Sequence, residues 1–244
     1  MQRRPPELPR AQIIKRIDHT PDLWSIKLEK KPNYTFKSGQ YITIGVDGLE
    51  RPYSIASAPD EPFIEIFIER IPPEEGGQLT PVLHKLKQGD TVSMRPSAKG
   101  LFLMEPKYKA QVMVCTVTGI APFMSMLRDH FSKGRTGNHF YILHGGSYFD
   151  ELVYSDELRQ IAAAHPQDVT YVPTVSRPKE ERNKGWEGEG GRVNLVLDRA
   201  LEKFHLNAAE TIIYVCGHPG MIEDVKARFT PKGWNVKEER YWKD

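Results

Sequence analysis

Residues 51–59, RPYSIASAP, place three chemically different side chains close together between two strand-like runs. A guanidinium such as that of Arg51 can hold a phosphate through paired N–H donors. Tyr53 can flank a flat ring system, and the Ser54 hydroxyl can hydrogen-bond a ring nitrogen. The pattern indicates a site for an aromatic ligand that carries phosphate. The alternative is a barrel strand with incidental polar residues.

A second set of phosphate-binding side chains comes much later in the chain. Ser176 and Arg177 follow an apolar run in TVSRP, and Arg192 begins the next helix-like segment. One hydroxyl and two guanidinium groups can grip a phosphate monoester. The alternative is three polar surface residues that share no ligand.

The segment TVTGIAP also follows an apolar run. Gly119 lets a ligand approach the backbone closely, and the helix after it offers unpaired N–H groups to an anion. A glycine after a strand can equally be structural. The segment matches neither GxGxxG nor GxxxxGK[ST], which disfavours nucleotide sites of those two types.

Cysteine and aromatic residues near the C-terminus have two interpretations each. Cys216 is either a small buried hydrophobic residue or a nucleophile, although no histidine–carboxylate relay accompanies it. His218, two residues later, is expected to be solvated or to cap a helix. Tyr241 and Trp242 either pack into the core or cover a flat ligand.

Composition excludes several classes of protein. The 244 residues suit one large or two small domains, and a net charge of +2 is too small to indicate nucleic-acid binding. No run approaches about 18 apolar residues, so no membrane span is expected. Residues 1–10 lack the apolar core of a secretory signal. HExxH and CxxC are absent, and no metal site is expected.

The two cysteines, Cys115 and Cys216, also limit the chemistry. They cannot build a disulfide framework or a four-thiolate iron–sulfur cluster. We therefore expect a reducing compartment, the cytoplasm.

Two rhythms of apolar residues predict two domains. The first hundred residues contain short strand-like runs, YITIGV, PYSIAS, FIEIFIERI and DTVSMRP, separated by turn formers such as VDGLE. They predict an antiparallel barrel or sandwich. A short helix is expected at TPVLHKL, with Thr80 as N-cap and Pro81 at its first position.

After residue 106 apolar runs alternate with helical spacing. AQVMVC, HFYILHG, VTYVPTVSR and TIIYVCGHP are each followed by a helix-like segment, which predicts a parallel α/β sheet. The expected domains are residues 1–106 and 107–244. Ligands of such a sheet bind beyond the carboxyl ends of its strands.

These motifs, in this order, resemble the ferredoxin–NADP reductase family. RPYSIAS resembles the R-x-Y-S flavin motif of that family. TGIAPFMSMLRD, ELVYSDEL, TVSRP and CGHPGM are similar to its pyridine-nucleotide half, and the ending ERYW resembles the bacterial ferredoxin or flavodoxin reductases. The resemblance covers nearly the whole chain from about residue 10.

The resemblance implies a six-stranded antiparallel barrel that binds FAD and a sheet of about five parallel strands that binds NADP(H). Arg51 would contact the FAD pyrophosphate, Tyr53 would pack on the flavin, and Ser54 would sit near flavin N5. Tyr241 would cover the other flavin face and leave for nicotinamide, and Trp242 would stack on adenine. Further FAD-binding residues would be Pro52, Ile66, Phe67, Ile68, Gln78, Leu79 and Thr80.

For the nucleotide half, the resemblance implies a nicotinamide site and a 2′-phosphate clamp. Cys216 would border the nicotinamide beside Ser54, and Glu239 would help to relay the N5 proton. Residues lining the nicotinamide and pyrophosphate would be Thr118, Gly119, Gly217 and Met221, and the clamp would be Ser176, Arg177 and Arg192.

This sequence departs from the family pattern at three places. Val117 stands where the family often has glycine, and Ser147 stands where many bacterial members have the arginine of HGxR. The loss of that cation should weaken the preference for NADP. Lys243 and Asp244 extend the chain beyond the aromatic cap.

The expected function is an FAD-dependent exchange of electrons between NADP(H) and a one-electron carrier. With two cysteines in the chain, the carrier must be a separate protein, a ferredoxin or flavodoxin that docks through lysines and arginines. A monomer is expected. The alternatives are an NADH-dependent reductase component of an oxygenase or another complex, and a non-catalytic flavin-binding regulatory subunit.

Overall fold

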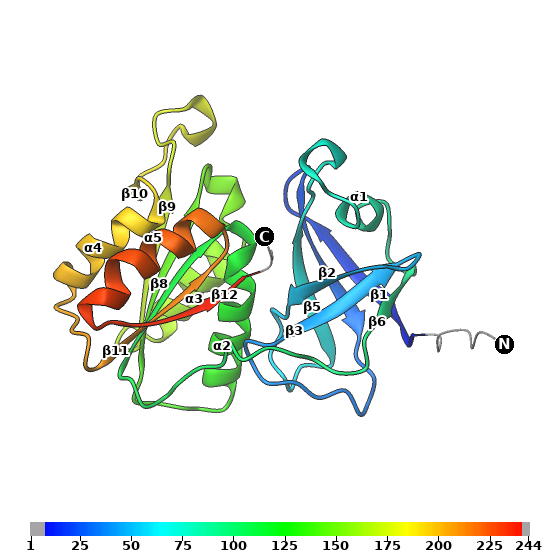
Figure 1. The fold of residues 1–244 in the computed structure, drawn as a ribbon, viewed down its shortest axis with the longest axis horizontal. Coiled ribbons are helices and arrows are strands. Elements are labelled where there is room, and N and C mark those ends of the chain that lie inside the picture. Colours follow the sequence, from blue (N-terminus) through cyan, green and yellow to red (C-terminus); the bar gives the residue numbers. More distant parts are fainter. Residues whose placement is uncertain (1–7, 241–244) are drawn as a thin grey trace. The chain divides into compact units, whose positions relative to one another are not determined.

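The computed structural model describes residues 8–240, and the chain divides into two compact units. The first comprises Met1–Leu103 with Met124–Asp129, and the second comprises Met104–Phe123 with His130–Asp244. Figure 1 shows strands that curl round one another in the first unit and a sheet flanked by helices in the second. An antiparallel β domain followed by a parallel α/β domain is therefore confirmed.

Six strands form the sheet of the first unit, in the order β4-β3-β6-β1-β2-β5, and every pairing is antiparallel. The strands are β1 (Arg10–Asp18), β2 (Leu23–Glu29), β3 (Tyr41–Val46), β4 (Leu49–Ser54), β5 (Phe63–Glu69) and β6 (Thr91–Met94). A bridge between Ile55 and Ile66 joins the chain just after β4 to β5. Because β4 and β5 are the edge strands, this bridge closes the sheet into a barrel.

The hairpin from β3 to β4 follows directly from the sequence. Asp47 and Gly48 have φ values of 50° and 83°, the left-handed conformations that a two-residue hairpin turn requires. The turn predicted from VDGLE is confirmed. β1 and β2 are not among the predicted strands, because lysine, arginine and glutamate interrupt their apolar alternation.

Aliphatic side chains from all six strands fill the barrel around Trp24. Ile42 and Ile44 alternate inward along β3 and are fully buried. Burying each such side chain contributes about 1.5–3 kcal/mol. The apolar pattern of the predicted strands thus forms the core of the first unit.

Part of helix α2 (Ala121–Ser132) belongs to the first unit. Within Met124–Asp129, Arg128 donates to the Ala56 carbonyl at 3.0 Å and lies 3.2 Å from the Glu65 carboxylate. Glu65 is only 4% exposed, so its charge depends on nearby cations. This ion pair fastens the segment to the barrel.

The second unit is a parallel sheet with the strand order β10-β9-β8-β7-β11-β12. Its strands are β7 (Ala110–Thr116), β8 (His139–Gly146), β9 (Val169–Val175), β10 (Glu189–Gly190), β11 (Thr211–Cys216) and β12 (Asn235–Glu239).

The α-helices of both units are α1 (Thr80–Leu83) in the first unit, α2 (Ala121–Ser132), α3 (Ser155–Ala164), α4 (Val193–Lys203) and α5 (Pro219–Phe229). Short 3-10 helices occupy Pro73–Glu75, Val117–Ile120, Phe149–Glu151, Glu181–Asn183 and Thr230–Lys232.

This sheet has six strands rather than about five. The two-residue β10 and the edge strand β12 are absent from the predicted strands. β12 reads NVKEE, which carries three charged residues and one aliphatic residue. Charges of this kind are typical of edge strands and hide the strand pattern in the sequence.

Helices cover both faces of the parallel sheet. α4 and α5 pack with the apolar side chains of the central strands, among them Val112, Val114, Leu143, Ile213 and Val215. On the other face, Phe123 of α2 meets the ring of Tyr214 edge to face, with centroids 6.5 Å apart. Within residues 8–240, every helix is too short or too polar to cross a lipid bilayer.

Candidate active site

In the first unit, two segments that were predicted to bind FAD lie side by side: residues 51–54 and residues 78–80. Arg51 Nη2 donates to Gln78 Oε1 at 3.0 Å, across 27 positions of sequence. Both side chains are exposed. The two segments expected to hold the same pyrophosphate are thus neighbours.

Tyr53 lies two residues along β4 from Arg51. Its hydroxyl is buried and has no hydrogen-bond partner among the described residues. Burial raises the pKa of this phenol well above its usual value, and the nearby charge of Arg51 opposes the shift. A buried hydroxyl without a partner is costly, so this group fits a polar ligand atom.

The remaining first-unit candidates are held in the barrel wall. Ile66 and Ile68 are fully buried, and Phe67 and Leu79 are nearly so. Beyond the Ile55–Ile66 bridge, β5 pairs only with β2 among the described strands. Its outer backbone groups, rather than its side chains, are therefore the ones that can meet a ligand.

Thr80 is not the N-cap of α1. Leu79 holds that position without a side-chain cap, and the helix ends at Leu83 after a single turn. The Thr80 hydroxyl instead donates to the Ile71 carbonyl at 3.2 Å and accepts from the Ile71 N–H at 2.9 Å. The sequence prediction of a threonine cap was wrong because the hydroxyl has a better tertiary partner.

In the second unit, the parallel topology gathers the candidates at one edge. Thr118 and Gly119 follow β7, Gly217 follows β11, and Ser176 and Arg177 follow β9. All these strands run in the same direction, so their carboxyl ends meet. This is the edge at which open α/β sheets bind ligands.

Two glycine turns at this edge touch each other. A Cβ on Gly119 would lie 2.2 Å from the Cys216 carbonyl oxygen, and one on Gly217 would lie 2.3 Å from Thr116 Oγ1. Gly217 also has a φ of 127°. The Thr116 hydroxyl accepts from the His218 N–H at 2.8 Å. No other residue type fits either position, because the neighbouring turn already fills the space that a Cβ would need.

His218 is the N-cap of α5, as one of its two predicted roles required. Its Nδ1 accepts from the Gly220 N–H at 3.1 Å. Met221, two residues inside the helix start, lies in the hydrophobic core of the unit.

A row of titratable side chains crosses the sheet near the same edge. Strand register pairs Glu239 with Cys216, Cys216 with Cys115, and Cys115 with His144. The three residues other than Glu239 are fully buried. Partners in one row point to the same face of a sheet.

Burial sets the charge of this row. It raises the pKa of Glu239 to about 7, raises the pKa of Cys115 well above its usual value, and lowers the pKa of His144 to about 3. Glu239 Oε2 has no hydrogen-bond partner among the described residues. Near pH 7, Glu239 therefore exchanges a proton readily while Cys115 and His144 stay neutral.

This row does not form a nucleophilic relay. His144 lies two strands from Cys216, or about 9–10 Å between Cα atoms. Its Nδ1 is 3.2 Å from the Tyr171 hydroxyl. His144 is therefore too far away to activate the Cys216 thiol.

Two of the residues predicted to bind phosphate, Ser176 and Arg177, line a hollow after β9. A cavity of about 380 Å³ is lined by Ser176, Arg177, Pro178, Lys179 and Glu180. Arg192 precedes α4, is exposed, and has no side-chain partner within residues 8–240. β10 pairs with the end of β9, so Arg192 and Arg177 leave the sheet at the same edge.

Sequence reasoning missed the residues that hold this loop in place. Asn183 is buried and donates to the Ser147 and Arg177 carbonyls, both at 2.9 Å. It also accepts from the Phe149 N–H at 2.9 Å. An asparagine within KEERNKG gives no sequence signal, because its partners lie as far as 36 positions away.

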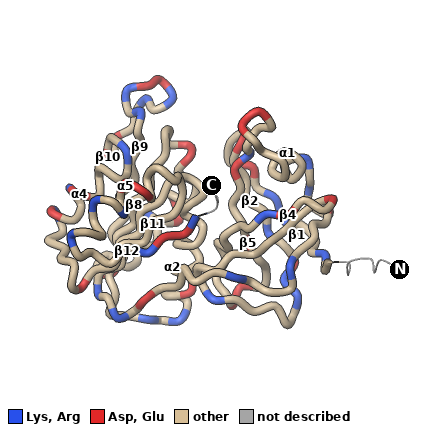
Figure 2. Tube along the Cα trace, viewed as in Figure 1, with Lys and Arg blue, Asp and Glu red and all other residues tan. Residues whose placement is uncertain are grey.

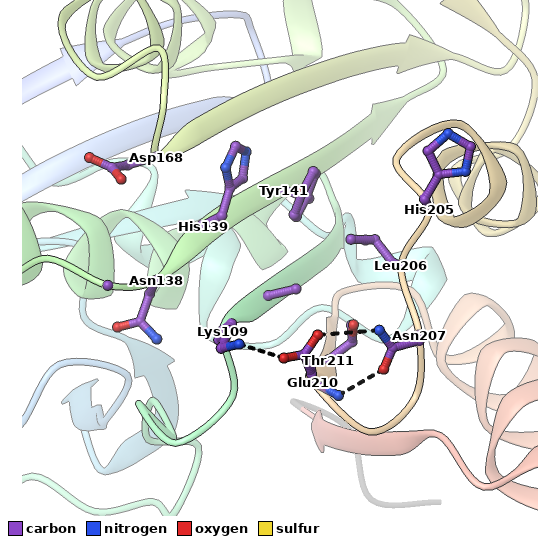
Figure 3. Close-up of a pocket in the computed structure, with 12 residues that line it drawn as sticks. Lys109, Asn138, His139, Tyr141, Asp168, His205, Leu206, Asn207, Glu210 and Thr211 are labelled. Carbon is purple, nitrogen blue, oxygen red and sulfur yellow. Dashed lines mark hydrogen bonds and ion pairs between the residues drawn. The ribbon is translucent and has the colours of Figure 1, made fainter.

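Another cavity opens at the opposite, amino edge of this sheet (Figure 3). Two of its polar pairings join lining residues, Lys109 with Glu210 at 2.6 Å and Asn207 with Glu210. His139 hydrogen-bonds Thr170, which lies outside the lining, at 2.8 Å. None of the predicted site residues lines it. The candidate nucleotide residues all lie at the carboxyl edge instead.

Tyr241 and Trp242, the predicted aromatic cap, lie outside the described residues. Among residues 8–240, no three histidine, cysteine, aspartate or glutamate side chains are grouped so as to hold a metal ion.

Comparison with known proteins finds relatives over most of the chain. The family model described as the oxidoreductase NAD-binding domain matches residues 113–227. The ferredoxin–NADP reductase of Pseudomonas aeruginosa is 31% identical, over 84% of this chain and 82% of the relative. The naphthalene 1,2-dioxygenase system ferredoxin–NAD(P)(+) reductase component of Pseudomonas putida is 26% identical, over 90% of this chain and 63% of the relative.

Solved structures agree with these relatives. A ferredoxin NADP+ reductase from Neisseria gonorrhoeae, with bound FAD and NADP, is similar with a TM-score of 0.81 and 26% identity. The match covers 96% of this chain and 99% of that one, so it includes the barrel as well as the parallel sheet.

Proposed function

This chain belongs to the ferredoxin–NADP reductase family, and on that premise we propose that it is an FAD-dependent oxidoreductase that exchanges electrons between NADP(H) and a one-electron carrier. The carrier is a separate ferredoxin or flavodoxin. The observation that carries the proposal is the contact between Arg51 and Gln78 beside the buried, unpartnered Tyr53 hydroxyl. Such a grouping fits a ligand with both a phosphate and a flat ring.

In this proposal, residues of the first unit hold FAD. Arg51 and Gln78 bind the pyrophosphate, and the Tyr53 hydroxyl gains the polar partner that it lacks among the described residues. Ser54 lies at the end of β4 and hydrogen-bonds near flavin N5. The further FAD contacts are Pro52, the β5 backbone at Ile66, Phe67 and Ile68, and the segment Leu79–Thr80.

Residues of the second unit hold NADP(H). The turns at Gly119 and Gly217, with Thr118 beside Gly119, lie at the carboxyl edge of the sheet and are the proposed neighbours of the pyrophosphate and nicotinamide. Cys216 positions the nicotinamide. Ser176, Arg177 and Arg192 hold the 2′-phosphate, and Tyr241 and Trp242 remain part of the proposal as the flavin cap.

Bound FAD supplies the conversion between two-electron and one-electron transfer, which no side chain can perform. The protein orients the two cofactors and excludes water from them. Glu239 would relay the flavin N5 proton: its pKa of about 7, and an Oε2 that has no hydrogen-bond partner among the described residues, suit a carboxyl that gives and takes a proton.

The proposal is tested by the visible spectrum of the purified protein and an anaerobic titration with NADPH. We expect flavin absorption that NADPH bleaches, and reduction of an added ferredoxin or flavodoxin. Arg51→Ala should weaken FAD retention, whereas Arg95→Ala, which breaks an exposed ion pair with Glu50, should not. A colourless protein that takes up neither FAD nor FMN would refute the proposal.

A second candidate is an NADH-dependent reductase component of an oxygenase system. Ser147 favours it, because many bacterial members of the family carry an arginine there that helps to hold the NADP 2′-phosphate. The relative from a dioxygenase system also has this kind of role in its name. Comparison of kcat/KM for NADPH and NADH, with ferredoxin and oxygenase partners as acceptors, separates the two candidates.

The proposal also includes a monomer in a reducing compartment, the cytoplasm. Both cysteines are buried in the sheet and neither forms a disulfide, which is consistent with such a compartment. Sedimentation at micromolar concentration tests the monomer.

A further inference from the structure

Three side chains at the predicted 2′-phosphate clamp are already bound to one another. Arg177 Nη1 donates to the Tyr148 hydroxyl at 3.0 Å, and that hydroxyl donates to Glu180 Oε2 at 2.6 Å. The other oxygen of Glu180 lies 3.6 Å from Arg177 Nη1. The guanidinium of Arg177, which is predicted to bind the 2′-phosphate, therefore already has the Glu180 carboxylate beside it.

A second carboxylate lies at the same loops. Glu151 accepts from the backbone N–H groups of Ser147 at 2.7 Å and of Tyr148 at 3.2 Å. The hydrogen bond to Tyr148, with smaller contributions from Glu180 and Glu151, raises the pKa of Arg177. Two N–H groups that could bind a phosphate at HGGS thus already hold an anionic side chain.

The rest of the loop adds no excess of positive charge. Residues 177–189 contain four basic and four acidic residues. Figure 2 shows both signs along the loop between β9 and β10. Arg182 pairs with Asp150 at 2.9 Å, and Lys184 pairs with Glu181 at 2.9 Å. A phosphate monoester with a charge of about −1.5 to −2 therefore finds no net attraction from residues 177–189 and has Arg192 as its cation without a side-chain partner among the described residues.

Hydrogen bonds hold the backbone of this loop in place, so a phosphate and Glu180 would compete for Arg177 without a change of loop conformation. The buried amide of Asn183 holds the carbonyls of Ser147 and Arg177, and its backbone N–H donates to the Glu180 carbonyl at 2.8 Å. Removing the charge of Glu180 should leave the loop conformation unchanged.

We infer that Glu180 sets the coenzyme preference. Its carboxylate competes with the 2′-phosphate of NADPH for the Arg177 guanidinium, and it accepts a hydrogen bond from the ribose hydroxyl of NADH. A ribose hydroxyl is neutral and can donate to a carboxylate, as in other dinucleotide sites, whereas a 2′-phosphate is repelled by one. The protein then uses both coenzymes with comparable efficiency. This inference rests on the proposed function and names its coenzyme class.

The experiment compares kcat/KM for NADPH and NADH, with ferricyanide as acceptor, in the flavin-loaded wild type and in Glu180→Gln. We expect a wild-type NADPH-to-NADH ratio within about tenfold of one, and an increase of about threefold to tenfold in Glu180→Gln. The increase should shrink as ionic strength rises. Glu181→Gln is the matched control: it removes a charge one residue away that pairs with Lys184, and it should change the ratio by less than about twofold.

A double variant tests whether Glu180 acts through Arg177. In Glu180→Gln with Arg177→Ala, the gain for NADPH should disappear, because the released cation is absent. An unchanged ratio in Glu180→Gln, with the flavin still reduced by either coenzyme, would overturn the inference and leave the proposed function intact. If neither coenzyme bleaches the wild-type flavin, the proposed function fails and the inference fails with it.

Discussion

The backbone of Val117 offers a sharp test of the local structure at the nucleotide edge. Val117 follows the end of β7 and has a φ of 44°, in the left-handed region. Branched side chains rarely occupy this region, because Cβ crowds the adjacent carbonyl. The family often has glycine at this position, which relieves that crowding. The proposed perturbation is a pair of variants, Val117→Gly and Val117→Ala.

The difference in the free energy of unfolding between the two variants measures the cost of a Cβ at this backbone conformation. Both lose the half-buried methyl groups, so that loss cancels. Glycine removes a Cβ that costs about 1–2 kcal/mol at this φ, and it loses about 0.4–1 kcal/mol through the more flexible unfolded chain. We expect Val117→Gly to be more stable than Val117→Ala by about 1 kcal/mol.

The assay is urea unfolding at a fixed concentration of FAD. Ala227→Gly, at an exposed position within α5, is the control, and it should lose about 1 kcal/mol because glycine is disfavoured there. The sign of the alanine–glycine difference should thus be opposite at the two sites. If Val117→Ala proves as stable as Val117→Gly, or more so, the backbone at this residue is not left-handed and the reasoning fails.

Three other predictions concern buried polar groups. The wild type should lose stability as pH rises, because the Glu239 carboxyl has a pKa of about 7 in the folded state and about 4.5 in the unfolded state, and Glu239→Gln should remove this loss. Between pH 5 and pH 8, the free energy of unfolding of the variant should rise by about 2–3 kcal/mol relative to the wild type; equal pH profiles would contradict this. Arg128→Met should cost up to about 3 kcal/mol in urea unfolding, because it removes one of the cations beside the buried Glu65 carboxylate and leaves Lys27 at 3.8 Å. The added change Glu65→Gln should restore most of the loss, and no recovery would count against a charge effect. Asn183→Ala should cost about 1–3 kcal/mol and raise KM for both coenzymes while the flavin spectrum stays unchanged; an altered spectrum would show that the effect is not confined to the loop.

The sequence by itself determined the elements whose signal is local. YITIGV became β3 without a change of boundary, and AQVMVC became β7 with one residue added, because apolar side chains repeat there with the period of the structure. The hairpin at Asp47 and Gly48 was equally predictable from turn chemistry. The sequence also placed Ser176 and Arg177 after a strand, where the topology of a parallel sheet brings ligand-binding residues together.

Tertiary structure alone decided the contacts between segments distant in the chain. Local propensity does not indicate that part of α2 joins the barrel through Arg128, or that the Thr80 hydroxyl turns to Ile71 rather than capping its helix. Nor does it indicate that Glu180 reaches Tyr148, 32 positions away, and so lies beside Arg177 of the predicted clamp. Such pairings depend on which strands become neighbours, and the energy of a polar side chain depends on the partner that folding brings to it.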